Sequence, residues 1–389
     1  MAEPKETVHG GDIYRNPSVT DYSVNSNPLG VPEAVRKSVQ ESADRIMYYP
    51  DVRCDRLRES ISDFERIEKE KILCGNGAAE LFFAVVMAVR PKKALVTAPA
   101  FSEYERALGT VGAEVQYYRL KEEQDFRIQE DILEQITEDT DMIFLCNPNN
   151  PTGQTTEKEL LIRVMNRCNK CGTILVLDEC FIEFLEEPER YECRGYLTQY
   201  PNVVIIKAFT KIFCMPGVRL GYALCENAAL RKRMRAMLQP WNVSVIAQEA
   251  GIAALDEKDR VEKMRRMIQI ERMEIEKQLD ILKIDFVSSD ANFILIYSEI
   301  NLFEELLQYG ILIRDCANYR GLETGWYRIA VKQRHENEQL LKALKEIIER
   351  NRQEADIDGK TDHDTGNDVE CREECAGRRS LPHLEGGRL

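Results

Sequence analysis

Residues 203–222 of the 389-residue chain read VVIIKAFTKIFCMPGVRLGY, and this stretch decides the fold. Its apolar, β-branched start predicts a buried strand over residues 203–206. The chain then turns at Lys211, and Arg219 follows eight residues later. A lysine just past a buried strand lies where α/β folds place their chemistry. Desolvation there lowers the pKa of the amine, which can then form an imine with an aldehyde, while Arg219 can bind a phosphate.

Strands and helices alternate along the preceding part of the chain. Apolar runs predict strands at 72–74, 94–97, 114–120, 142–145 and 173–177, with helices between them. This alternation predicts an α/β fold with a mostly parallel sheet sandwiched by helices. Asn150, Asp178 and Lys211 each follow a predicted strand, which places them at the edge of the sheet where ligands bind.

The composition excludes some classes of partner. A net charge of −14 argues against nucleic acid, because phosphate backbones need a basic face. No run of about 20 apolar residues predicts a membrane span, and the first residues lack the apolar core of a signal peptide. The chain has twelve cysteines, many of them within predicted strands and helices, where Cys behaves as a small hydrophobe. A reducing cytoplasm is therefore expected.

The chain is long enough for about two domains. We expect an N-terminal arm over residues 1–45, which joins the smaller domain, and a large domain over residues 46–258. A long charged helix at 261–282 connects to a smaller α+β domain over 259–352, with strands at 293–297 and 328–331 and helices at 302–309 and 336–350. Residues 353–389 are polar and Gly-rich, and they predict a poorly packed tail.

The stretch around Lys211 resembles the Schiff-base segment of fold-type I pyridoxal-phosphate enzymes, in the class I/II aminotransferase group. Such a site needs an imine lysine, a carboxylate on the pyridine nitrogen, a donor to the phenolic oxygen, a stacking aromatic ring and a phosphate cup. The candidates are, in that order, Lys211, Asp178, Asn150 and Tyr104, with the cup formed by Gly77, Ala78, Ala79, Thr210 and Arg219. Taken singly, Asp178 could cap a helix, Tyr104 could lie in the core, and Asn150 could shape a turn.

Three further segments resemble the threonine-phosphate decarboxylases of cobalamin biosynthesis, which are related to the histidinol-phosphate aminotransferases. These segments are HGG at 9–11, DECFIEF at 178–184 and IRDCANYRGLETGWYRIAV at 313–331. The resemblance implies a small phosphorylated amino acid as substrate and a homodimer, in which Tyr49 reaches the cofactor phosphate of the neighbouring subunit. It also implies substrate contacts at His9, Gly10, Asn25, Asn150, Arg314 and Arg328.

Three positions depart from the residues common in these families. Aminotransferases commonly carry a tyrosine where this chain has Phe181, which favours the decarboxylase. Ala208 and Ala79 stand where hydroxyl residues are common, and both changes count against the resemblance because they remove phosphate donors and predict a lower cofactor affinity. Lys211, Asp178 and Arg219 remain, so an active enzyme is still expected. Decarboxylation of O-phospho-L-threonine is therefore expected, and transamination of histidinol phosphate or a similar amino acid is the alternative.

The tail contains a second candidate site. His363, Cys371, Cys375 and His383 are two imidazoles and two thiols, a ligand set that suits tetrahedral zinc. The C-x₃-C spacing is weaker than C-x₂-C, and chance in a polar tail is the competing explanation.

Overall fold

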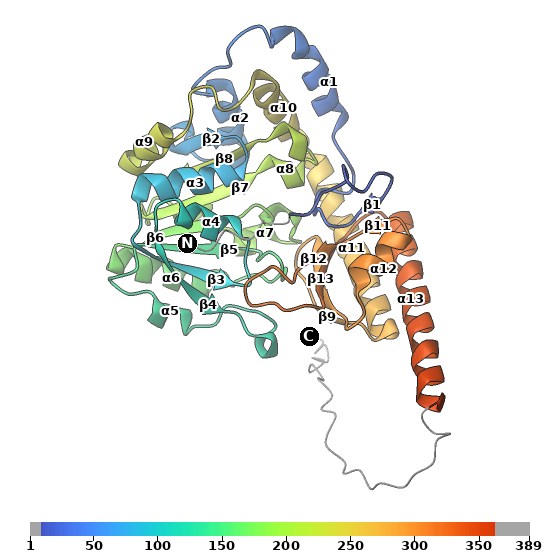
Figure 1. Cartoon of the computed structure of the whole chain (residues 1–389). Coiled ribbons are helices and arrows are strands. Elements are labelled where there is room, and N and C mark those ends of the chain that lie inside the picture. Colours follow the sequence, from blue (N-terminus) through green and yellow to red (C-terminus); the bar gives the residue numbers. More distant parts are fainter. Residues whose placement is uncertain (1–8, 362–389) are drawn as a thin grey trace, which may run out of the picture.

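A seven-stranded sheet forms the centre of the larger domain (Figure 1). The computed structural model describes residues 9–361, with side chains up to residue 354. The strand order is β2-β8-β7-β6-β5-β3-β4, and all strands but β8 run in the same direction. The strands are β2 (Ile72–Gly75), β3 (Lys93–Ala98), β4 (Glu114–Arg119), β5 (Met142–Cys146), β6 (Ile174–Asp178), β7 (Val203–Ala208) and β8 (Gly221–Cys225).

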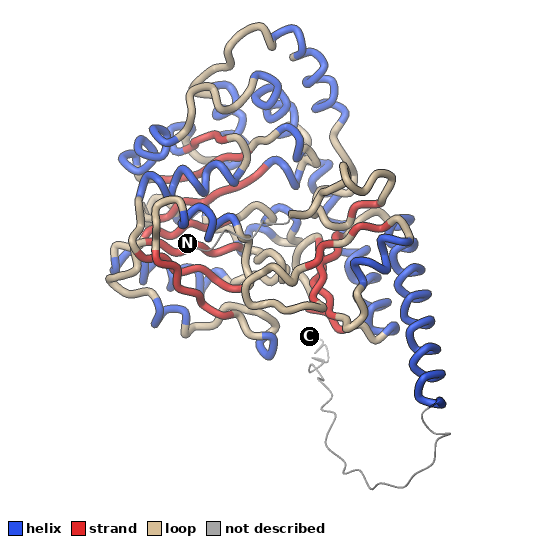
Figure 2. Tube along the Cα trace, viewed as in Figure 1, coloured by secondary structure: helices blue, strands red, loops and turns tan. Residues whose placement is uncertain are grey.

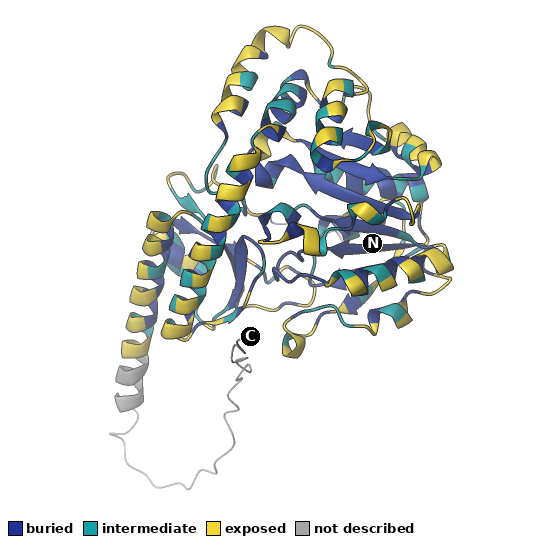
Figure 3. Cartoon of the chain, turned by 180° about the vertical axis from the view of Figure 1, so that it is seen from behind, coloured by how far each residue is buried: buried dark blue, intermediate teal, exposed yellow. Residues whose placement is uncertain are grey.

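Both faces of this sheet are covered by helices, as a mostly parallel sheet requires. On β7, Val204 and Ile206 belong to one apolar cluster, and Val203 and Ile205 belong to the other. Seen from behind, the strands lie as a buried layer between partly exposed helices (Figure 3). Helices α3 (Ala78–Val89), α4 (Glu103–Gly109) and α9 (Ala228–Met237) contribute to the first cluster, and α2 (Asp55–Glu65), α6 (Lys158–Cys171), α10 (Val245–Leu255) and α11 (Lys258–Leu282) to the second.

The smaller domain contains an antiparallel four-stranded sheet in the order β12-β13-β10-β9 (Figure 2). The N-terminal arm lies against this domain, because β1 (Thr20–Asp21) pairs with β11 (Ile311–Leu312). The remaining elements are α1 (Glu33–Glu41), α5 (Ile132–Gln135), α7 (Pro188–Tyr191), α8 (Phe209–Ile212), β9 (Asp285–Val287), β10 (Phe293–Tyr297), α12 (Leu302–Gln308), β12 (Arg314–Asp315), β13 (Trp326–Ala330) and α13 (Arg334–Thr361).

Several elements differ from the sequence-based expectation. The antiparallel strand β8 and the helices α9 and α10 were not predicted. Helix α5, one of the helices expected between the strands, has only four residues, and α13 runs to Thr361, past the expected start of the tail at 353. The predicted zinc ligands His363, Cys371, Cys375 and His383 lie outside the described residues. Within residues 9–361 no cluster of metal-ligating side chains occurs, and no helix there is long and apolar enough to cross a membrane.

Candidate active site

A cavity of about 290 Å³ lies where the parallel strands end. Its walls come from the start of α3, from the ends of and loops after β3, β5, β6 and β7, from the N-terminal arm and from the smaller domain. The predicted residues that line it are His9, Gly10, Asn25, Ala78, Ala79, Asn150, Asp178, Thr210, Lys211, Arg219, Arg314 and Arg328. Segments far apart in the sequence thus converge at one edge of the sheet, as doubly wound folds require.

Lys211 lies on the short helix α8, directly after β7. Burial, together with the positive charges of Arg328 and Arg219 and against the opposing effect of Cys180, lowers the pKa of its amine to about 8. The backbone carbonyl of Lys211 accepts a 2.9 Å hydrogen bond from the amide of Asn27, which holds the N-terminal arm against the site. A partly deprotonated amine at neutral pH is suited to attack on an aldehyde.

Asp178 is the last residue of β6 and is buried. Burial raises the pKa of its carboxyl group, and hydrogen bonds from Cys180 and Tyr104 oppose this rise. The Cys180 amide donates to Oδ1 at 2.9 Å, and the Tyr104 hydroxyl donates to Oδ2 at 2.5 Å. The carboxylate is therefore fixed at the wall of the cavity on two sides.

The start of α3 and Arg219 form one region suited to an anion. The first N–H groups of a helix have no partner within the helix, and no side chain caps α3. Gly77 precedes the helix with φ +85°, and a Cβ atom there would lie 2.6 Å from Nη2 of Arg219. Gly77 does not line the cavity, but its missing side chain lets the Arg219 guanidinium approach the helix terminus.

Arg314 and Arg328 form a second anion region on the smaller domain. They lie opposite each other in the β12–β13 pair, so both side chains leave the same face of the sheet. Their exposed fractions are only 7% and 6%, and within the described chain neither has a carboxylate partner. Arg314 donates to Asn318 Oδ1 at 2.8 Å. Arg328 donates to Ser23 O at 2.8 Å and to Asn150 Oδ1.

Two polar atoms near this region have no partner among the described residues. Nε of Arg328 and Oδ1 of Asn25 are both buried without a hydrogen bond. Because unpaired buried polar groups are costly, such atoms favour a bound polar ligand. Also at the cavity, His9 Nε2 lies 3.2 Å from Glu103 Oε1, and this contact lowers the pKa of Glu103.

The structure corrects the assignment of the stacking aromatic. Tyr104 was predicted to stack on a cofactor ring, but it is fully buried and does not line the cavity. It lies behind Asp178 instead, and Phe101, three residues earlier, lines the cavity. The cavity is also lined by Tyr319, which sequence reasoning did not single out although it falls within the motif at 313–331.

Tyr49, another predicted residue, also lies away from this cavity. Its side chain is 79% exposed, and its ring lies 4.5 Å from that of Trp241. Ile46, Met47 and Tyr48 beside it are also exposed. Within one chain, Tyr49 therefore takes no part in the site.

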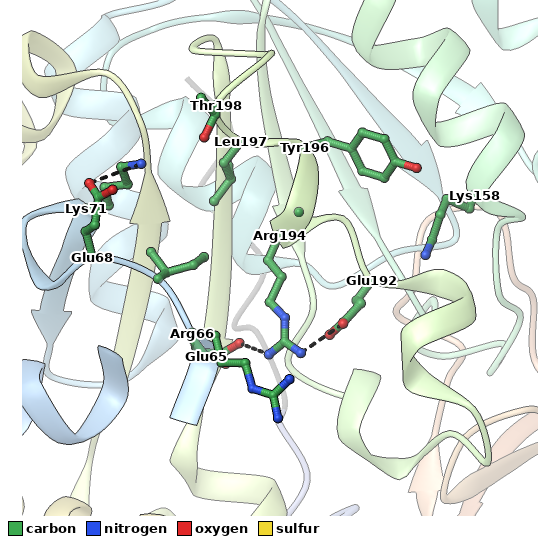
Figure 4. A pocket seen from close by; sticks show the side chains of 12 residues that line it. Glu65, Arg66, Glu68, Lys71, Lys158, Glu192, Arg194, Tyr196, Leu197 and Thr198 are labelled. Atoms are coloured by element: carbon green, nitrogen blue, oxygen red, sulfur yellow. Dashed lines mark hydrogen bonds and ion pairs between the residues drawn. The ribbon is translucent and has the colours of Figure 1, made fainter. Parts of the chain in front are cut away.

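A larger cavity of about 430 Å³ lies elsewhere on the large domain (Figure 4). Its main charges neutralise one another: Arg194 lies between Glu65 and Glu192, at 2.6 and 3.0 Å, and Lys71 pairs with Glu68 at 3.3 Å. The cluster of Glu65, Arg194 and Glu192 is thus a self-neutralised region, whereas Arg314 and Arg328 of the Lys211 cavity have no carboxylate partner among the described residues.

The sequence matches the aminotransferase class I and II family over residues 17–347. The chain belongs to this family. It is 34% identical to the threonine-phosphate decarboxylase of Salmonella typhimurium, over 88% of this chain and 97% of that protein. Among solved structures, the histidinol-phosphate aminotransferase of Clostridium acetobutylicum superposes with a TM-score of 0.80 at 32% identity, over 85% of this chain and 99% of that one.

A second solved structure is the L-threonine-O-3-phosphate decarboxylase of Porphyromonas gingivalis. It superposes with a TM-score of 0.76 at 26% identity, over 84% of this chain and 99% of that one. The fold is thus the fold-type I architecture that the sequence predicted.

Proposed function

We propose that this protein is a pyridoxal-phosphate-dependent decarboxylase, which converts O-phospho-L-threonine to (R)-1-aminopropan-2-yl phosphate and carbon dioxide in cobalamin biosynthesis. The observation that carries the proposal is the paired, buried Arg314 and Arg328 without a carboxylate partner among the described residues. A substrate that bears both a carboxylate and a phosphate presents two anions, and two guanidinium groups can bind them with charge-assisted hydrogen bonds.

The residues of the cavity fit the cofactor. The α3 N-terminus, with the N–H groups of Ala78 and Ala79, and Arg219 and Thr210 would hold its phosphate, and Phe101 would face its ring. Asn150 would donate from its amide to the phenolic oxygen, because its Oδ1 already accepts from Arg328. When bound, pyridoxal phosphate supplies an electron sink for the bond that breaks at the substrate Cα.

The chain's own groups then have separate tasks. Asp178 holds a proton on the pyridine nitrogen, and this positive charge strengthens the electron sink. Arg314 and Arg328 bind the anionic ends of the substrate and orient the carboxylate that leaves. Lys211, with the pKa of its amine near 8, can deliver a proton to Cα after carbon dioxide departs.

Phe181 supports decarboxylation over transamination. It lines the cavity at the position where aminotransferases commonly have a tyrosine, and it packs against Phe293 at 5.1 Å. The likeness to the Clostridium acetobutylicum histidinol-phosphate aminotransferase supports the second candidate, which is transamination of histidinol phosphate. Both activities share the cofactor region and differ in which bond at Cα breaks.

The deciding experiment supplies O-phospho-L-threonine and measures released carbon dioxide, beside a transamination assay with histidinol phosphate and 2-oxoglutarate. Carbon dioxide in stoichiometric amount with the aminopropanol phosphate is expected. Formation of glutamate in the second assay, with no carbon dioxide in the first, would overturn the decarboxylase proposal and support the aminotransferase.

We further propose a homodimer in the cytoplasm. The exposed apolar segment that includes Ile46, Met47, Tyr48 and Tyr49 supports an interface, because contiguous exposed hydrophobic side chains mark interaction surfaces. Tyr49 would then reach the cofactor phosphate of the neighbouring subunit. The cysteines of the described chain are free thiols, in keeping with a reducing compartment. Light scattering should give twice the chain mass, and a monomeric mass would contradict the proposal.

A further inference from the structure

Tyr104 is among the most deeply buried polar side chains next to the site. Its side chain has 0% exposure, and its ring stacks on Phe144 with centroids 4.9 Å apart. The ring of Phe82 meets it edge-on at 5.0 Å. These contacts leave the tyrosine ring little freedom, so the direction of its hydroxyl is set by packing.

The hydroxyl has a single charged partner, the Asp178 carboxylate, at 2.5 Å. Burial and the neighbouring carboxylate raise the pKa of Tyr104 well above its usual value, so the hydroxyl keeps its proton and stays a donor. Asp178 lines the cavity, whereas Tyr104 does not. Tyr104 therefore approaches the carboxylate from the side opposite to the ligand.

We propose that Tyr104 is a positioning residue, whose hydroxyl fixes the orientation of the Asp178 carboxylate and keeps it charged while water is excluded. The inference rests on the proposed function only in that Asp178 is taken to meet the cofactor's pyridine nitrogen. Each carboxylate oxygen accepts more than one hydrogen bond, so the bond from Tyr104 leaves capacity for a ligand. The Cys180 amide supplies the second fixed donor, on Oδ1.

The chain offers a matched control for this role. Tyr118 is also buried, at 4% exposure, and its hydroxyl also donates to a carboxylate, that of Asp131. Neither Tyr118 nor Asp131 lines the Lys211 cavity. Tyr104→Phe and Tyr118→Phe therefore remove the same chemical group from a hydroxyl–carboxylate pair, once beside the site and once away from it.

The test measures two properties of the cofactor-loaded protein, without substrate. One is the dissociation constant of pyridoxal phosphate, and the other is the pH midpoint at which the visible band of the bound cofactor titrates. Loss of a hydrogen bond to a charged group predicts about tenfold to a hundredfold weaker binding in Tyr104→Phe. The pH midpoint should rise, because this band follows the proton on the imine nitrogen that Lys211 forms with the cofactor, and a ring that Asp178 keeps less firmly protonated carries less positive charge to repel that proton. Tyr118→Phe should change neither property.

A double-mutant cycle with Asp178→Asn separates positioning from general packing. The proposal predicts that Tyr104→Phe adds little further loss of cofactor affinity in the Asp178→Asn background. An equal loss in both backgrounds would overturn it, as would an unchanged affinity and pH midpoint in Tyr104→Phe. Because no substrate enters these measurements, failure of the decarboxylase proposal in the carbon dioxide assay would be distinguishable from failure here.

Discussion

Lys207 and Lys211 are four residues apart, yet their surroundings are opposite. Lys207 is 3% exposed, and its Nζ lies 2.8 Å from Glu65 Oε1 and 2.9 Å from Glu183 Oε1. Burial alone would lower the pKa of Lys207, but these carboxylates raise it well above its usual value. Burial and the neighbouring arginines together lower the pKa of Lys211 to about 8. Nearby charges therefore decide whether a buried amine stays protonated and unreactive or becomes partly neutral and reactive.

The same contrast separates the two regions around these lysines. Around Lys207, Arg194 also binds Glu65, and Arg265 also binds Glu183 at 2.9 Å, so the charges there are satisfied within the chain. Around Lys211, the described part of the chain provides no carboxylate partner for Arg219, Arg314 or Arg328. Since buried charges are normally paired, the buried cations Arg314 and Arg328, which lack a carboxylate partner among the described residues, indicate where an anionic ligand binds.

The largest expected effect is that of Lys211→Ala. We expect a loss of turnover of about 10³-fold or more, together with loss of the visible band that reports linkage of the cofactor to the lysine. Thermal unfolding of the apoprotein should change little, because the Lys211 amine makes no hydrogen bond to a described residue. An unchanged visible spectrum in the variant would rule Lys211 out as the linking residue.

Lys207→Met should act on stability instead. Removal of one partner of a buried ion pair destabilises proteins by about 3–5 kcal/mol, and we expect the lower end because Glu65 and Glu183 each keep an arginine. Urea unfolding of the apoprotein measures this, with Lys232→Met on the exposed face of α9 as the control, for which about 0.5 kcal/mol or less is expected. If Lys207→Met unfolded like wild type but lost the visible band, the division of roles between the two lysines would be wrong.

Arg328→Lys should weaken substrate binding. Lysine keeps the charge but loses the planar fork that reaches both Ser23 and Asn150. A lost charge-assisted hydrogen bond of about 2 kcal/mol corresponds to roughly a 30-fold higher KM for O-phospho-L-threonine. Cofactor affinity should fall much less. Arg194→Lys is the matched control in the self-neutralised region, and it should lower stability without raising KM. Equal losses of substrate and cofactor affinity in Arg328→Lys would assign Arg328 to the cofactor instead.

The alternating strands from β2 to β7 and most of the cavity were predictable from sequence, because parallel strands bring their carboxyl ends to one edge. The strand-end residues Asn150, Asp178 and Lys211 meet there as local patterns imply. The choice between Phe101 and Tyr104 was not predictable, since aromatic residues three apart fit the same face of a helix. In the structure α4 begins only at Glu103, so Phe101 stays in the loop beside the cavity and Tyr104 turns into the core.

The environment of Lys207 was also beyond sequence reasoning. The sequence of a buried strand that contains one lysine predicts only that this lysine needs a partner. That partner, Glu65, lies 142 residues away on α2, and the hydroxyl of Tyr222 reaches it from β8, a strand that the sequence did not reveal. Long-range pairing of buried charges depends on topology, and local periodicity carries no information about it.

The smallest expected effect is a change with pH in the acylation of Lys211 in the apoprotein. This experiment also compares the two lysines most directly. Only the neutral amine reacts. With a pKa of about 8, roughly a tenth of Lys211 is neutral at pH 7 and about nine tenths at pH 9. Its labelling by an amine-reactive ester should therefore rise about tenfold over this range. Lys207 stays protonated and should remain unlabelled throughout.

Both lysines lie close enough for one proteolytic peptide, so mass spectrometry compares them in the same molecule. Pyridoxal phosphate, added first, should protect Lys211. Labelling of Lys207 in parallel with Lys211 would mean that the ion pairs with Glu65 and Glu183 do not hold its proton, and the contrast between the two regions would fail.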